Sequence, residues 1–120
     1  MNNSETLKIA LKAAVEAGNT LIEHNKDNLK VSKKESLRDI VTEIDKITER
    51  KIINILKDFN SEITILTEES GISKGKKENL TWVVDALDGT VNYVNNLQYY
   101  GVSIALLENN TPIVGVIFNP

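Results

Sequence analysis

Two aspartates close an apolar run in the segment WVVDALDGTVNYV, and their spacing is compatible with a metal site. Asp85 follows three apolar residues, Asp88 comes three positions later, and Gly89 and Thr90 follow directly. Two carboxylates this close repel each other when both are ionised, and a bound divalent cation removes that penalty. Magnesium prefers oxygen ligands such as carboxylates, waters and phosphate. The segment therefore predicts a magnesium site in which Asp85 bridges two ions, Asp88 holds one, and the carbonyl of Leu87 adds an oxygen.

The two residues after Asp88 extend this prediction to a phosphate. Gly89 lets a backbone approach a ligand closely, and a short helix beginning at Thr90 would present free N–H groups to an anion. An ordinary turn is the alternative, because in D-x-x-D-G the aspartate caps backbone N–H groups and the glycine supplies a positive φ. Spacing alone does not decide between these two interpretations.

Other acidic and basic residues could join the same site. Glu68 and Glu69 end the alternating run EITILT and could reach the metal from a neighbouring strand, or they could form a solvated acidic pair. Asp45 could act as a base or orient a hydroxyl such as that of Thr90. Alternatively, Thr42 and Asp45 match a capping box at the start of a helix. The run KVSKK, residues 30–34, could supply a cation to a phosphate or form a solvated face.

The hydrophobic periodicity predicts the elements that must position these residues. Apolar residues recur every three or four positions across two segments, while short alternating or β-branched runs predict strands. The expected elements are helices over residues 5–28 and from Thr42 to about Asp58, a short strand and loop over 29–38, strands over 62–67, 80–85, 98–107 and 112–118, a polar loop over 68–79, and a hairpin turn at Asn109–Asn110. Helices precede most strands, so we expect helices layered on a sheet.

Composition narrows the function classes. The chain has 120 residues, a net charge of −3 and no cysteine. The charge predicts no nucleic-acid or membrane partner. The lack of cysteine excludes disulfides, zinc–thiolate sites and thiol catalysis, and it fits the reducing cytoplasm, where we expect the protein. No signal peptide is recognisable at the N-terminus.

Five segments resemble the inositol monophosphatase family, whose members are magnesium-dependent, lithium-sensitive phosphatases. DIVTEID, ILTEESG, WVVDALDGTVNYV, YYGVSIAL and PIVGVIFNP stand in the order and at the intervals of that family, and the resemblance covers residues 5–120. It implies an α/β (α+β) fold with layered helices and a mostly antiparallel sheet. It also implies that residues 1–120 are the N-terminal, metal-binding part of the domain, with the C-terminal part absent.

The resemblance also implies a role for each matching residue. Glu68 would bind the first metal, Asp85 would bridge two metals, Leu87 would give its backbone oxygen and Asp88 would bind the second metal. Gly89 and Thr90 would bind the phosphate, and Lys34 would lie near the active-site loop. The Thr90 hydroxyl, paired with Asp45, would orient the attacking water. Glu68, Asp45 and Thr90 are thus the expected catalytic residues, and Mg²⁺ is the expected cofactor.

The expected function is magnesium-dependent hydrolysis of a small phosphate monoester, with inositol monophosphate as the first choice of substrate. The alternatives are a nucleotide or fructose bisphosphate phosphatase of the same superfamily and a non-catalytic interaction module. The resemblance further implies a homodimer. Thr67, Ala86 and Val91 depart from the family pattern, and the later segment W-D-x-A-A-G is absent. That segment carries another metal-binding aspartate, so we expect weak or no catalysis by these 120 residues alone.

Overall fold

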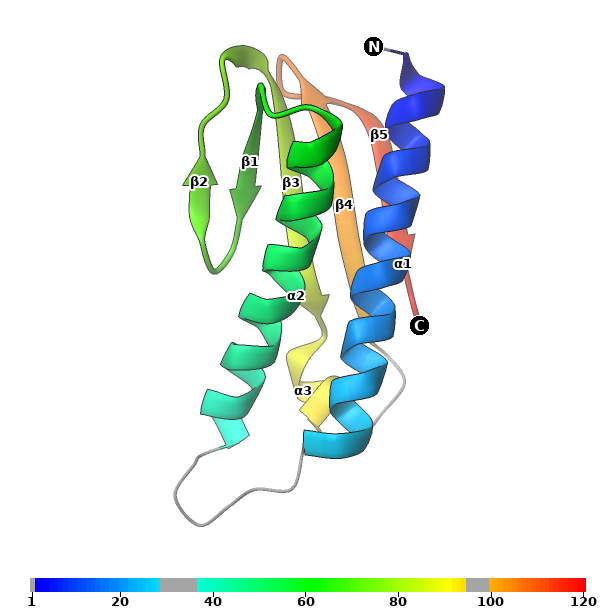
Figure 1. Cartoon of the computed structure of the whole chain (residues 1–120), viewed down its shortest axis with the longest axis vertical. Helices are drawn as coiled ribbons and strands as arrows, with labels where there is room; N and C mark the ends of the chain where they lie inside the picture. The colour runs from blue at the N-terminus through cyan, green and yellow to red at the C-terminus, as the bar shows by residue number, and fades with distance from the viewer. Residues whose placement is uncertain (1, 29–36, 95–99) are drawn as a thin grey trace.

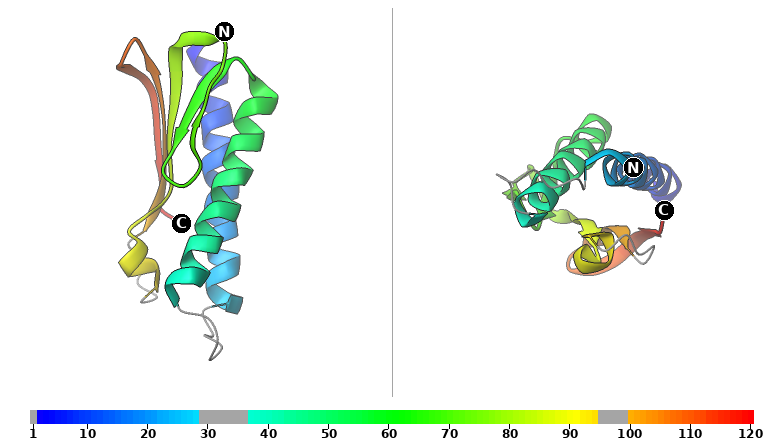
Figure 2. Two further views of the ribbon diagram at one scale, coloured as in Figure 1. Left: turned by 90° about the vertical axis from the view of Figure 1, so that its left-hand side faces the viewer. Right: turned by 90° about the horizontal axis from the view of Figure 1, so that it is seen from below.

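Two long helices cover one face of a five-stranded sheet. The computed structural model describes residues 2–28, 37–94 and 100–120. The elements are α1 (Asn3–Asn28), α2 (Leu37–Phe59), β1 (Ile63–Thr67), β2 (Gly71–Ser73), β3 (Lys77–Asp88), α3 (Thr90–Val94), β4 (Gly101–Glu108) and β5 (Thr111–Phe118). Helices α1 and α2 lie side by side on the same face, as Figures 1 and 2 show from three directions. This arrangement confirms the expected helices layered on a sheet.

The sheet is mixed and mostly antiparallel, as the resemblance implied. Its strand order is β2-β1-β3-β4-β5. Among these described strands, β1 and β3 pair in parallel and the other neighbours pair antiparallel. The predicted hairpin turn between β4 and β5 is confirmed, since Asn109 and Asn110 adopt φ angles of 50° and 66°. Asparagine tolerates this left-handed region better than most residues do.

The core lies between the helices and the covered face of the sheet. Every second residue of β4 is buried, as expected for a strand with one covered face. Helix α1 presents a row of fully buried alanines, Ala10, Ala13, Ala14 and Ala17. These short side chains let α1 pack closely, and a Cβ added at Gly18 would lie only 2.3 Å from the ring of Phe118. The close packing holds α1 against β5.

Helix α2 begins five residues earlier than the sequence predicted. It starts at Leu37, so Thr42 lies in the helix interior, and the capping box proposed for Thr42 and Asp45 is wrong. The apolar stripe continues upstream through residues 37, 40, 41 and 44 without a breaker, and it outweighs the local capping signal. The short strand and loop expected over 29–38 lie mostly outside the described residues, and the last two residues of that range are helical.

The polar loop after β1 is also shorter than predicted. Residues 71–73 form β2, which pairs antiparallel with β1, and β3 begins at Lys77. Backbone pairing with β1 supports β2, although the residues of β2 have no alternating apolar pattern of their own. Within the described part of the chain, no helix is long and apolar enough to cross a membrane.

Candidate active site

A bulge at the end of β3 positions the two aspartates. Asp85 pairs with Ser103 and Asp88 with Gly101, so three steps along β3 match two along β4. The extra residue forms a β-bulge, which bends a strand and redirects its side chains. Asp85 is half-buried and Asp88 is exposed. The two carboxylates thus come from the irregular end of a strand whose earlier part is core.

The chain then turns sharply into the short helix α3. Gly89 has a φ of 88°, a left-handed conformation that glycine adopts without the penalty paid by other residues. Thr90 begins α3 directly afterwards. Both features agree with the predicted turn and short helix after Asp88. Next to them lies an open hollow of about 420 Å³, lined by Asp88, Gly89, Asn92, Tyr100, Gly101, Ile117 and Asn119.

Helix α2 contributes two buried carboxylates to the same region. Asp45 is 8% exposed and Glu49 is 1% exposed, and they stand one helical turn apart, which places them on one face. The Glu49 carboxylate accepts hydrogen bonds from the N–H groups of Glu69, at 3.1 Å, and Ser70, at 2.8 Å. The turn after β1, which also carries Glu68, is thereby attached to α2.

The electrostatics show that these acidic groups lie near one another. The pKa of Asp45 is raised from 3.8 to about 7, mostly by burial and in addition by the nearby negative charges of Glu69, Glu49, Asp85 and Glu68. A carboxyl with this pKa is about half protonated at neutral pH. Such a value suits a group that exchanges a proton during a reaction.

The carboxyl group of Asp85 responds to the same surroundings. Burial raises its pKa most, and the charges of Asp88 and Glu49 raise it too. The N–H of Leu87 donates a hydrogen bond to Asp85 Oδ1 at 3.3 Å and acts in the opposite direction on the pKa. The predicted ligands Asp85 and Asp88 therefore influence each other, and both belong to the acidic region that includes Asp45.

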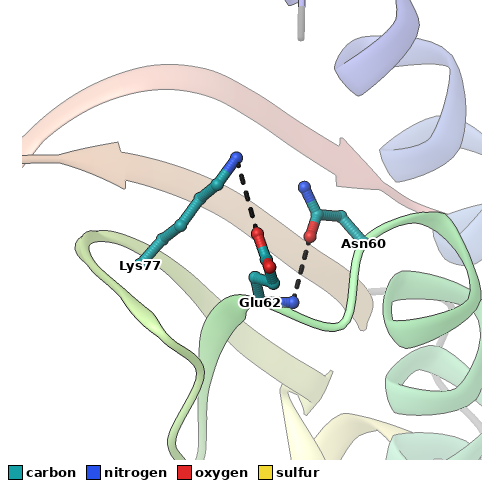
Figure 3. Close-up of polar contacts among 3 residues, drawn as sticks. All are labelled: Asn60, Glu62 and Lys77. Atoms are coloured by element: carbon teal, nitrogen blue, oxygen red, sulfur yellow. Dashed lines mark hydrogen bonds and ion pairs between the residues drawn. The ribbon is translucent and has the colours of Figure 1, made fainter.

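Among the side chains that the structure describes, no positive one neutralises this region. The recorded ion pair, Lys77 with Glu62 at 3.9 Å, lies at the opposite end of β1 (Figure 3). There the Asn60 side-chain oxygen also accepts the N–H of Glu62 at 3.0 Å. Lys34, the cation expected from the resemblance, lies outside the described residues. A set of carboxylates without a cation is chemically suited to Mg²⁺, which prefers oxygen ligands.

The coordination shell itself is not assembled by these side chains. Among the Asp, Glu, His and Cys side chains that the structure describes, no three converge closely enough to hold an ion. Thr90 is an exposed residue, and no hydrogen bond joins its hydroxyl to Asp45 in the described part of the chain. The assigned roles of Glu68, Asp85, Leu87, Asp88 and Thr90 therefore stay predictions.

Glu49 is the residue that sequence reasoning missed. A glutamate in a helix with many charged residues resembles any solvated side chain. The available signal was its position: Glu49 stands four residues after Asp45 and three before the core residue Ile52. That spacing places it on the buried face of the helix.

Comparison with known sequences shows the class of protein that this fold and site define. The sequence model of the inositol monophosphatase family matches residues 2–120. The chain therefore belongs to the inositol monophosphatase family, as its motifs indicated.

Individual relatives agree with this assignment. The Nus factor SuhB of Pasteurella multocida is 41% identical over 116 residues, which cover 95% of this chain and 43% of that protein. The crystal structure of the extragenic suppressor protein suhB from Bartonella henselae superposes with a TM-score of 0.84 at 29% identity, covering 97% of this chain and 44% of the other. The inositol monophosphatase from Anabaena gives 0.81 at 35% identity, covering 100% and 42%. The chain thus spans less than half the length of these relatives.

Proposed function

We propose that residues 1–120 form the N-terminal, metal- and phosphate-binding part of a magnesium-dependent phosphomonoesterase, with inositol monophosphate as the first substrate to test. One observation carries the proposal. Burial, together with the charges of neighbouring carboxylates, raises the pKa values of Asp45 and Asp85, and none of the Lys or Arg side chains that the structure describes pairs with that group. A divalent cation would remove this repulsion.

Each side chain then has a task that fits its location. Glu68 and Asp88 are exposed, Asp85 is half-buried, and with the carbonyl of Leu87 they would supply oxygens to metal. Bound magnesium would lower the pKa of the attacking water and neutralise the leaving alkoxide.

The phosphate would lie against the turn that follows Asp88. Gly89, with no side chain at its φ of 88°, and the N–H of Thr90 would bind it. The Thr90 hydroxyl would donate to Asp45, and this pair would orient the attacking water. Lys34 would add a positive charge near the phosphate.

A second candidate function is a non-catalytic interaction module. The observation that favours it is the name Nus factor, which the Pasteurella multocida relative carries and which is not the name of a hydrolase. This chain would then use its surface to bind a partner, and its carboxylates would have no catalytic task. A dimer, a cytoplasmic location and the absence of a nucleic-acid partner stay predictions under both functions.

The test separates these functions by asking whether phosphate binding requires metal. Inorganic phosphate, the product of the proposed reaction, is titrated calorimetrically into the chain with and without Mg²⁺. We expect binding only with Mg²⁺, because the carboxylates repel phosphate until a cation intervenes. Equal heats with and without Mg²⁺, or no binding at all, would favour the interaction module. In an assay of phosphate release from inositol monophosphate, we expect at most weak turnover by these 120 residues.

A further inference from the structure

The buried carboxylate of Glu49 holds the turn between β1 and β2 by both of its oxygens. Oε2 accepts the N–H of Glu69 at 3.1 Å, and Oε1 accepts the N–H of Ser70 at 2.8 Å. Glu49 itself is only 1% exposed. Two charge-assisted hydrogen bonds from consecutive backbone groups to one carboxylate fix both the position and the orientation of a turn.

Two contacts between Thr67 and Gly71 also hold the two ends of this turn together. Thr67 and Gly71 pair across it, and the Thr67 hydroxyl donates to the carbonyl oxygen of Gly71 at 3.2 Å. Glu68 is therefore carried on a short turn whose base is closed by Thr67 and whose tip is bound to α2 by Glu49. The Glu68 side chain itself is exposed, so its backbone is fixed while its carboxylate is open to a ligand.

Glu49 also relates this turn to the other acidic residues. It stands one helical turn after Asp45, and its charge acts on both Asp45 and Asp85. A displacement of the Glu68 turn relative to α2 would therefore change its distance from Asp45 and from the end of β3. Among the described residues, Glu49 is the side chain that hydrogen-bonds to the backbone of residues 69 and 70.

We infer that Glu49 is a positioning residue, which holds the Glu68 turn at the distance from Asp45 and Asp85 that metal binding requires. The inference rests on the proposed function, since it assumes that Glu68 binds metal. Glu49 does not touch the metal in this account. It acts through the backbone of Glu69 and Ser70, as partners behind a metal ligand often do.

The variant Glu49→Asp separates the effect of the negative charge at residue 49 from the effect of its hydrogen bonds to the turn. Aspartate keeps the charge, but it is one methylene too short to reach both N–H groups. We expect Glu49→Asp to weaken Mg²⁺ binding about tenfold or more in a calorimetric titration of the whole chain, the range typical of residues behind a metal ligand. Glu62→Asp is the matched control, because Glu62 stands at the opposite end of β1. It should leave the affinity within about twofold, as is usual for exposed charges away from a site.

If Glu49→Asp binds Mg²⁺ as tightly as the wild type, Glu49 does not position the site, and the inference is wrong while the proposed function stands. If the wild type itself binds no Mg²⁺, the proposed function fails, and the inference falls with it.

A measurement on the wild type covers the case in which Glu49→Asp does not fold. Amide hydrogen exchange at Glu69 and Ser70 should be slow without metal and slower with Mg²⁺, because the metal would stabilise the same turn. Exchange at these two amides that Mg²⁺ leaves unchanged, while Mg²⁺ slows exchange at Leu87 or Asp88, would contradict the inference.

Discussion

The Tyr93 hydroxyl donates a 2.8 Å hydrogen bond to the carbonyl oxygen of Leu21, although the two residues are 72 positions apart. Tyr93 lies in α3 and Leu21 in α1, and both side chains are fully buried. The Tyr93 ring also meets the Tyr100 ring edge-on, with centroids 4.9 Å apart and an angle of 85°. The short helix that follows Asp88 and Gly89 is thereby fastened to the first helix of the chain.

The first prediction concerns this attachment. Tyr93→Phe keeps the ring but removes the hydroxyl, so the free energy of unfolding should fall by about 1 kcal/mol, the usual contribution of a buried hydrogen bond. The measurement is urea unfolding followed by the fluorescence of Trp82, the single tryptophan. Tyr100→Phe is the matched control, because no hydrogen bond of its hydroxyl is recorded among the described residues. Equal losses in the two variants would contradict the role of the Tyr93–Leu21 bond.

The second prediction concerns pH and the metal-free chain. Asp45 has a folded pKa of about 7 against an ordinary 3.8, so the folded state holds a proton that the unfolded state has already released. The protonated Asp45 therefore makes its whole contribution to the free energy of unfolding below about pH 4, and this contribution is lost as the pH rises towards 7. Asp45→Asn should raise the free energy of unfolding at pH 8 by on the order of 1 kcal/mol, with allowance for solvent screening.

Urea unfolding of the metal-free wild type and Asp45→Asn at pH 5, 6, 7 and 8 tests this sign. The two curves of stability against pH should converge at the acidic end and separate towards pH 8. A wild type that gains stability relative to Asp45→Asn as pH rises would show that the pKa of Asp45 is lowered rather than raised.

The third prediction concerns the glycine between Asp88 and α3. Gly89→Ala places a Cβ on a backbone with a φ of 88°, and the free energy of unfolding should fall by about 1–2 kcal/mol. Gly115→Ala is the control, because Gly115 has no atom within 4 Å of the added Cβ and is not among the positive-φ glycines. That variant should be neutral or slightly stabilising. Thermal unfolding of both variants by circular dichroism would decide, and equal melting temperatures would contradict the strain at Gly89.

The sequence predicted those elements that local pattern determines. A few neighbouring residues predict the periodic stripe of α1, the alternating run of β1, the strands β4 and β5 and the Asn109–Asn110 turn, and the structure confirms these elements. Residues 98 and 99, at the start of the strand expected over 98–107, lie outside the described residues. The sequence pattern did not predict elements that are stabilised by a partner distant in the sequence. β2 exists because β1 offers it a pairing edge, and its own residues, Gly71–Ser73, carry no strand signal.

The same distinction applies to the candidate site. The motif around Asp85 and Asp88 was visible because both carboxylates and Gly89 stand within five positions. The role of Glu49 could not be predicted from the sequence, because its partners Glu69 and Ser70 are 20 and 21 residues away. These partners donate hydrogen bonds from their backbone N–H groups, which no side-chain pattern reveals. Residue type can indicate chemistry, but a contact to a distant backbone requires the folded chain.

The most direct test of the account is a calorimetric titration of Mg²⁺ into the wild-type chain and into Asp88→Asn, at fixed pH and ionic strength. Asp88 is exposed at the bulge, so the amide keeps the shape of the side chain and removes one charged oxygen ligand. Glu108→Gln, at the far end of β4, is the control for the loss of one charge. The account predicts Mg²⁺ binding by the wild type and by Glu108→Gln, and at least tenfold weaker binding by Asp88→Asn. Absence of binding, or equal affinity in all three proteins, would contradict the assignment of this region as a magnesium site.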